Sequence, residues 1–165
     1  MVEVVLDTNV LVSAFRSSLG ASYQLLQTLE RGTWRPVISP ALAFEYEAVL
    51  KRGATGSNPT LQDVDEFVEY LCSRSRLVQI YFRWRPTLPD PDDDRILEVA
   101  VRTSRAAEVA AEEHVSVEEL FAAAFEERVL EFERLKDRAA KGSYEKFRKV
   151  MSKIPPTEPA DYDRL

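Results

Sequence analysis

The stretch that most limits how this chain can fold is the apolar run at residues 2–6, which leads into Asp7, Thr8 and Asn9. The run does not alternate strictly between apolar and polar residues, which is typical of a short parallel strand buried on both faces. Ligands of an open α/β sheet bind beyond the carboxyl ends of its strands, so Asp7 and Asn9 are expected at the mouth of the sheet. Asp7 or Thr8 would also serve as the N-cap of the next helix. The stretch alone does not separate a binding role from a capping role.

The length and composition of the chain fit one domain that carries a small additional segment. The chain has 165 residues, 45% of them hydrophobic, which is enough to bury a core. Its net charge of −6 disfavours indiscriminate binding to nucleic acid, but it does not exclude a nuclease, because bound cations invert the field at an acidic site. The single cysteine, Cys72, excludes a disulfide within the chain, so we expect a buried thiol in a reducing cytoplasm. We expect neither a signal peptide nor a membrane span.

Apolar periodicity predicts alternating helices and strands in the first half of the chain. We expect helices at 13–31, 41–51 and 60–75, and strands at 34–39 and 77–82. Ser39 and Pro40 form a typical helix start, with serine at the N-cap and proline at the first helical position. This alternation is typical of an α/β domain with a parallel sheet.

Glu45 is the second acidic residue that is a candidate for a functional role. The spacing of Leu42, Glu45 and Val49 predicts that Glu45 lies on the apolar side of its helix. A carboxylate buried there is costly unless it is paired or bound to a metal ion. The alternatives are a salt bridge to Lys51 or Arg52, or simple partial exposure.

The most acidic segment of the chain lies directly before a predicted apolar helix. It contains four aspartates, Asp90, Asp92, Asp93 and Asp94. Aspartates are favourable at a helix N-terminus, so one or two of them serve as caps. Four exceed what capping requires, and a divalent cation would relieve their mutual repulsion. Ligands that offer only oxygen suit Mg²⁺ or Mn²⁺, whereas the spacing does not fit a calcium loop.

Together, residues 7–13, 39–50 and 90–98 resemble the ordered motifs of the PIN domain, in particular those of the toxins of toxin–antitoxin pairs. The resemblance covers residues 1–102 and implies a Rossmann-like parallel sheet with helices on both faces. It also implies an endoribonuclease that depends on Mg²⁺ or Mn²⁺ and hydrolyses RNA. By this resemblance Asp7, Glu45 and Asp93 are the catalytic residues. The same three acids and Asp94 are the metal ligands, and Asn9 and Asp90 support them.

The resemblance to the PIN domain breaks after the third acidic motif, because no further strands follow. The remaining residues predict a helix, a turn at His114, a long helix to about residue 140 and a short helix at 144–152, before a polar tail. Ser116 and Glu119 predict a capping box for the long helix. Residues 104–165 resemble the ribbon-helix-helix-type antitoxins encoded beside such toxins, although their first strand is missing. His114 occupies a turn position where glycine would be easier.

We therefore expect a PIN-like α/β domain at 1–102 and an all-α, antitoxin-like segment at 103–165, joined naturally or by engineering. We expect the nuclease to be impaired or inhibited by its own C-terminal segment, with a cognate antitoxin as the other candidate partner. The strand missing from the family's sheet would lie beside the first strand. Its loss predicts an open edge, and hence a homodimer or larger homo-oligomer in which the 117–140 helix covers that side. DNA binding is disfavoured by the missing strand and the negative charge. The alternative function is a catalytically inactive toxin–antitoxin interaction or regulatory module.

Overall fold

The computed structural model describes residues 2–54, 59–79, 111–112 and 114–164. The chain divides into two compact units, one formed by Met1–Gln79 with Phe132–Leu165 and the other by Ile80–Glu131. The last 34 residues therefore belong to the same unit as the first 79. The acidic segment with Asp90, Asp93 and Asp94 lies outside the described residues.

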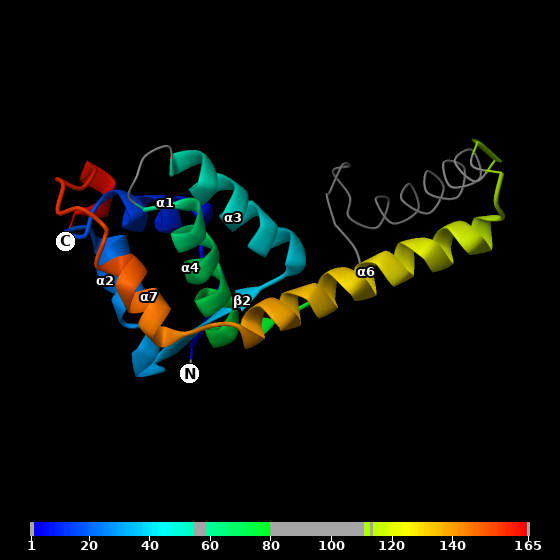
Figure 1. Ribbon diagram of the computed structural model, residues 1–165, viewed down its shortest axis with the longest axis horizontal. Coiled ribbons are helices and arrows are strands. Elements are labelled where there is room, and N and C mark those ends of the chain that lie inside the picture. The colour runs from blue at the N-terminus through cyan, green and yellow to red at the C-terminus, as the bar shows by residue number, and fades with distance from the viewer. Residues whose placement is uncertain (1, 55–58, 80–110, 113, 165) are drawn as a thin grey trace, which may run out of the picture. The chain divides into compact units, whose positions relative to one another are not determined.

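The first unit is built on a parallel sheet with the order β1-β2-β3, where β1 is Val2–Val4, β2 is Trp34–Ile38 and β3 is Arg76–Leu77 (Figure 1). The connections carry the helices α1 (Thr8–Arg16), α2 (Ala21–Gln27), α3 (Pro40–Gly53) and α4 (Leu61–Arg74), with a 3₁₀ turn η1 at Leu29–Arg31. Val2 pairs with Trp34, and Ile38 pairs with Leu77. This arrangement confirms the predicted α/β class with a parallel sheet, and a helical C-terminal segment follows it.

The first strand is less buried than its apolar sequence predicts. Val2 and Val5 are 65% and 66% exposed, whereas Leu6 is buried. A strand covered on both faces is therefore the wrong expectation for β1. The reason is its position, because among the described strands only β2 pairs with it. The predicted homo-oligomer stays a prediction.

The helix predicted at 13–31 is in fact broken in the middle. α1 ends at Arg16, Ser17 is extended with φ −145°, and α2 starts after Gly20. The backbone N–H of Ser18 donates to the carbonyl of Pro155 at 3.0 Å. The break is therefore stabilised by a segment far away in the sequence. The apolar periodicity of residues 13–31 could not predict it, because that pattern reflects only local neighbours.

Two predicted helix starts, at Ser39 and at Ser116, are confirmed, whereas the helix expected to begin at residue 13 begins at Thr8. Ser39 caps α3 and Pro40 is its first residue. Thr60 and Asp63 form a capping box at the start of α4. In the C-terminal part, Ser116 and Glu119 exchange the hydrogen bonds of a capping box for α6 (Val117–Ala140). Two short helices follow, α7 (Tyr144–Met151) and the 3₁₀ turn η2 (Asp161–Asp163). His114 has φ +57°, so the turn does use the left-handed conformation that favours glycine.

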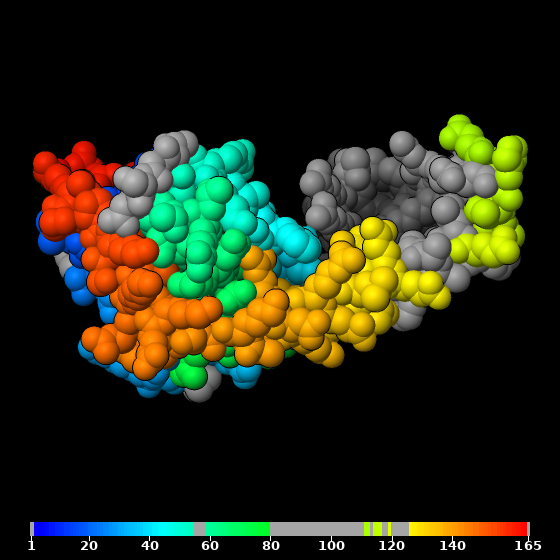
Figure 2. Space-filling view, in the orientation of Figure 1, coloured from blue at the N-terminus to red at the C-terminus, as the bar shows by residue number. Residues whose placement is uncertain are grey.

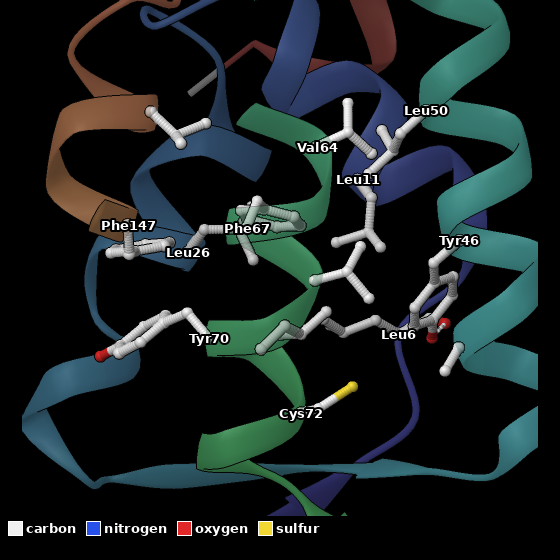
Figure 3. Close-up of a cluster of buried hydrophobic side chains, with 14 of the residues drawn as sticks. Leu6, Leu11, Leu26, Tyr46, Leu50, Val64, Phe67, Tyr70, Cys72 and Phe147 are labelled. Carbon is white, nitrogen blue, oxygen red and sulfur yellow. Dashed lines mark hydrogen bonds between the residues drawn. The ribbon is translucent and has the colours of Figure 1, made fainter. Parts of the chain in front are cut away.

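The core of the first unit includes side chains from the C-terminal segment. Phe67 of α4 is fully buried and packs edge-to-face on Phe15 of α1 at 4.8 Å between ring centroids. Phe147 of α7 stacks on Tyr70 of α4 at 4.4 Å (Figure 3). Cys72 is 1% exposed, and burial raises the pKa of its thiol to about 11, which confirms its expected role as a small core residue. Within the described ranges, no helix has the length and apolar character needed to cross a membrane.

Asp63 makes the stability of this unit depend on pH. Burial raises the pKa of its carboxyl, but hydrogen bonds from Lys153 and Thr60 outweigh burial and hold the pKa below its usual 3.8. Lys153 Nζ lies 2.6 Å from Asp63 Oδ1. A carboxyl with a lowered pKa stabilises the fold above its unfolded pKa, and this stabilisation is lost as the pH falls through the folded value.

We therefore expect Asp63→Asn to show a flatter acid dependence of the free energy of unfolding than the unmodified chain below about pH 5. The variant should also be less stable at neutral pH by roughly 1 kcal/mol, because a hydrogen bond to a charged group is lost. Urea unfolding at stepped pH values measures both effects. Asp161→Asn, at a carboxylate that is 92% exposed, is the control. Parallel pH profiles for Asp63→Asn and the unmodified chain would contradict the assignment.

Candidate functional site

Asp7 stands at the junction between β1 and α1. It is the N-cap residue of α1, and its Oδ1 accepts a hydrogen bond from the backbone N–H of Asn9 at 2.7 Å. The capping role that the sequence left open is therefore present. The side chain is exposed, and no other described residue binds or pairs with its carboxylate. Capping thus occupies one oxygen and leaves the other free for a ligand.

Glu45, in the second turn of α3, lies beside the start of α1. The hydroxyl of Thr8 donates to Glu45 Oε1 at 2.6 Å, which joins the second acidic motif to the first. The expected salt-bridge partners are engaged elsewhere, since Lys51 pairs with Glu47 and Asp65, and Arg52 Nε donates to the carbonyl of Ala48. Among the described residues, no lysine or arginine neutralises Glu45.

The expected place of Glu45 on the apolar side of its helix is wrong, and the alternative of exposure holds. The buried residues of α3 are Pro40, Ala43, Tyr46 and Leu50, and Glu45 is exposed. The helix is thus rotated by one position relative to the face defined by Leu42, Glu45 and Val49. Tyr46 explains the rotation, because its ring fills the core and its hydroxyl donates to the carbonyl of Leu6 at 2.5 Å (Figure 3).

The pKa of the Tyr46 hydroxyl depends on the negative charge around this site. Burial raises its pKa above the usual 10, and the negative charges of Glu45 and then Asp7 raise it further. Both carboxylates are therefore near the same hydroxyl, although they are 38 residues apart in the sequence. The parallel pairing of β1 and β2 causes this meeting, because Asp7 follows the first strand and α3 follows the second at the same edge of the sheet.

The described part of the chain thus supplies half of the predicted site. It brings together Asp7, Thr8 and Glu45, with Asn9 held against Asp7 through its backbone. Asp90, Asp93 and Asp94 lie outside the described residues, and among those that are described no group of three or more metal-ligating side chains occurs. Thr8 belongs to this group of side chains, although the sequence motifs did not predict it. Its only signal was its place between the two polar residues of the first motif.

The oxygen atoms that are present fit a hard divalent cation. Asp7 and Glu45 offer exposed carboxylates without a described cationic partner, and in the described part of the chain no histidine or cysteine forms a metal-ligating group with them. Carboxylate oxygens are the ligands preferred by Mg²⁺ and Mn²⁺. Two acids at the mouth of a parallel sheet are therefore suited to binding a cation together with a phosphate.

Comparison with known proteins agrees with this arrangement. The profile of one family, described as PIN domain, matches residues 3–109. No curated protein and no solved structure matches the chain. The matched span includes Asp7, Glu45 and the acidic segment at 90–94, and it ends before α6 and α7.

Proposed function

The chain belongs to the PIN domain family, and on that premise we propose that it is a metal-dependent endoribonuclease of the toxin type, which hydrolyses RNA phosphodiester bonds. PIN domains are generally nucleases and typically use divalent metal ions. The proposal for this chain rests on the hydrogen bond from Thr8 to Glu45, because it brings Glu45 next to the start of α1, where Asp7 lies. Neither carboxylate has a cationic partner among the described residues.

We assign the binding of Mg²⁺ or Mn²⁺ to Asp7, Glu45 and Asp93, with Asp94 beside them and Asn9 and Asp90 in support. A bound ion of this kind lowers the pKa of a water molecule and stabilises charge that develops on phosphate. The task of the chain is to hold the ligands in place. Asp7 is fixed by the backbone of α1, and Glu45 is oriented by the Thr8 hydroxyl.

The proposal is tested by Mn²⁺ binding and RNA cleavage on the full chain. Electron paramagnetic resonance should detect bound Mn²⁺, and a labelled single-stranded RNA should be cleaved with Mn²⁺ and spared with EDTA. Glu45→Gln should weaken Mn²⁺ binding at least about tenfold, because it replaces a charged ligand with a neutral one. The glutamine oxygen can still accept the hydrogen bond from Thr8, so the local geometry is kept. Glu30→Gln, at an acid on η1, is the matched control. A chain that binds no Mn²⁺ and cleaves no RNA would overturn the proposal.

A second candidate function is a catalytically inactive interaction module. It is favoured by the C-terminal segment, which lies outside the match to the PIN domain family but shares one compact unit with residues 1–79. Where the C-terminal segment meets α3 and α4, Arg138 donates to Glu47 and to Asp65. The same Mn²⁺ titration separates the candidates, because an interaction module needs no metal site.

A further inference from the structure

Residues 155–163, which we call the strap, close the C-terminal end of α1. The hydroxyl of Thr157 donates to the carbonyl of Arg16, the last residue of α1, at 2.5 Å. The hydroxyl of Ser17 donates to the carbonyl of Thr157 at 2.5 Å. The last carbonyls of a helix have no partner within the helix, so the strap supplies what α1 lacks. Figure 2 shows the red strap next to the blue N-terminal helices.

The same strap also caps the start of α2. The backbone N–H and the hydroxyl of Ser22 both donate to Asp163 Oδ1, at 2.8 and 2.5 Å. Gly20, the N-cap residue of α2, has no side chain to make these bonds, and a Cβ atom at Gly20 would collide with the Asp163 carboxylate. Asp163 is 3% exposed. The carboxylate thus replaces the missing cap and is favoured by the helix dipole.

The helix that the strap fixes is the one that begins at the candidate site. Asp7 is the N-cap of α1 and Thr8 is its first residue, whereas the strap contacts begin at Ser13 and end beyond Arg16. A helix of nine residues is about 13 Å long, and its backbone hydrogen bonds make it move as one piece. Displacement of its C-terminal end would therefore tilt the end that carries Asp7.

The other acid-bearing helix is also held by the C-terminal segment. Arg138 of α6 donates to Glu47 Oε2 at 2.6 Å and to Asp65 Oδ1 at 3.3 Å. Glu47 is two residues from Glu45 on α3. Residues outside the match to the PIN domain family thus contact both helices that carry the acids.

We propose that the strap is a positioning element of the candidate metal site: by capping α1 and α2 it fixes the placement of Asp7 and Thr8. This inference rests on the proposed function, because it assigns a purpose to that same site. The expected effect on activity is opposite to the effect expected if the C-terminal segment inhibited the nuclease by covering its acids. A strap that positions the ligands supports metal binding, so loosening it should lower activity, whereas loosening an inhibitory strap should raise activity.

The test compares Asp163→Ala and Gly20→Ala with the unmodified full chain. Asp163→Ala removes the cap, and Gly20→Ala expels the Asp163 carboxylate from its place. We expect each variant to bind Mn²⁺ about tenfold more weakly and to lower kcat about tenfold with little change in KM, since small misplacements of catalytic groups are costly. Hydrogen exchange should be faster at the backbone amides of Asn9 and Val10, whose partners are Asp7 atoms.

Three further variants make the test specific. Asp163→Asn keeps an acceptor for Ser22 and should restore most of the Mn²⁺ affinity. Asp161→Ala removes a carboxylate of the strap that is 92% exposed, and should change nothing. Phe147→Leu weakens the same C-terminal segment where it packs on α4, so it should lower Tm by several degrees and leave the Mn²⁺ affinity of the folded chain unchanged.

Two outcomes would overturn the inference. An unchanged or raised kcat in Asp163→Ala, with unchanged exchange at Asn9, would show that the strap does not position α1. Equal loss of Mn²⁺ affinity in Phe147→Leu would show that general destabilisation is the cause. If the unmodified chain neither binds Mn²⁺ nor cleaves RNA, the proposed function fails by itself. The exchange rates at Asn9 and Val10 then decide whether the strap fixes α1.

Discussion

Asp7→Asn is expected to lower the rate of RNA cleavage by a factor of about 10³ or more while the fold is kept. Asparagine has the same shape as aspartate and is an equally good N-cap, so its oxygen still accepts from the N–H of Asn9. What disappears is the negative charge of a proposed metal ligand. A bound ion contributes several kcal/mol to transition-state stabilisation, and each 1.4 kcal/mol corresponds to about tenfold in rate. Single-turnover cleavage with saturating Mn²⁺ measures the loss.

The control for Asp7→Asn is the same exchange at an exposed carboxylate outside the proposed metal site. Asp161→Asn should cleave RNA as fast as the unmodified chain, because the Asp161 side chain is 92% exposed and its described ion-pair partner is Arg164. Thermal unfolding should show similar Tm values for all three proteins. If Asp7→Asn kept a tenth or more of the activity, Asp7 would be a cap without a role in catalysis. Equal cleavage by every variant would point to a contaminating nuclease.

The parts of the fold that were predictable from the sequence are those stabilised by near neighbours. The start of α3 is an example, since Ser39 and Pro40 act on the residues directly after them. The break between α1 and α2 is the opposite case. Its backbone groups bind Pro155 and Asp163, which are more than 130 residues away in the sequence. No local pattern around Ser17 and Gly20 reveals a partner that only the folded chain brings there.

The candidate site shows the same division. Asp7 could be expected at the site because ligands bind beyond the carboxyl ends of parallel strands, and Glu45 was added to it by the resemblance to the PIN domain. The orientation of Glu45 could not be chosen, because both faces of α3 carry apolar residues and the buried Tyr46 decides between them. The pairing of charged side chains could not be predicted from the sequence either. Lys51 lies one turn beyond Glu47 and binds it, which leaves Glu45 without a described cationic partner.

The largest effect on stability is expected for Phe67→Ala. Phe67 is fully buried, and its ring contacts those of Phe15 of α1 and Phe147 of α7. Figure 3 shows Phe67 and Phe147 side by side in the core. Removal of a buried phenylalanine side chain costs about 3–5 kcal/mol, since the cavity closes only in part. A domain is stable by only about 5–15 kcal/mol, so the variant would be close to unfolding. Urea unfolding followed by tryptophan fluorescence measures the change, and Phe67→Leu gives a milder step if Phe67→Ala does not fold.

Phe44→Ala is the matched control, because Phe44 lies on α3 and is 49% exposed. Its loss should cost less than about 1 kcal/mol, since little apolar area is returned to water.

A double variant tests whether the C-terminal segment belongs to the core. Phe147 lies 6.0 Å from the Phe67 ring and should therefore couple to it, so that the double variant with Phe147→Leu loses less stability than the sum of the single losses. Additive losses would show that α7 packs on the domain without sharing its core.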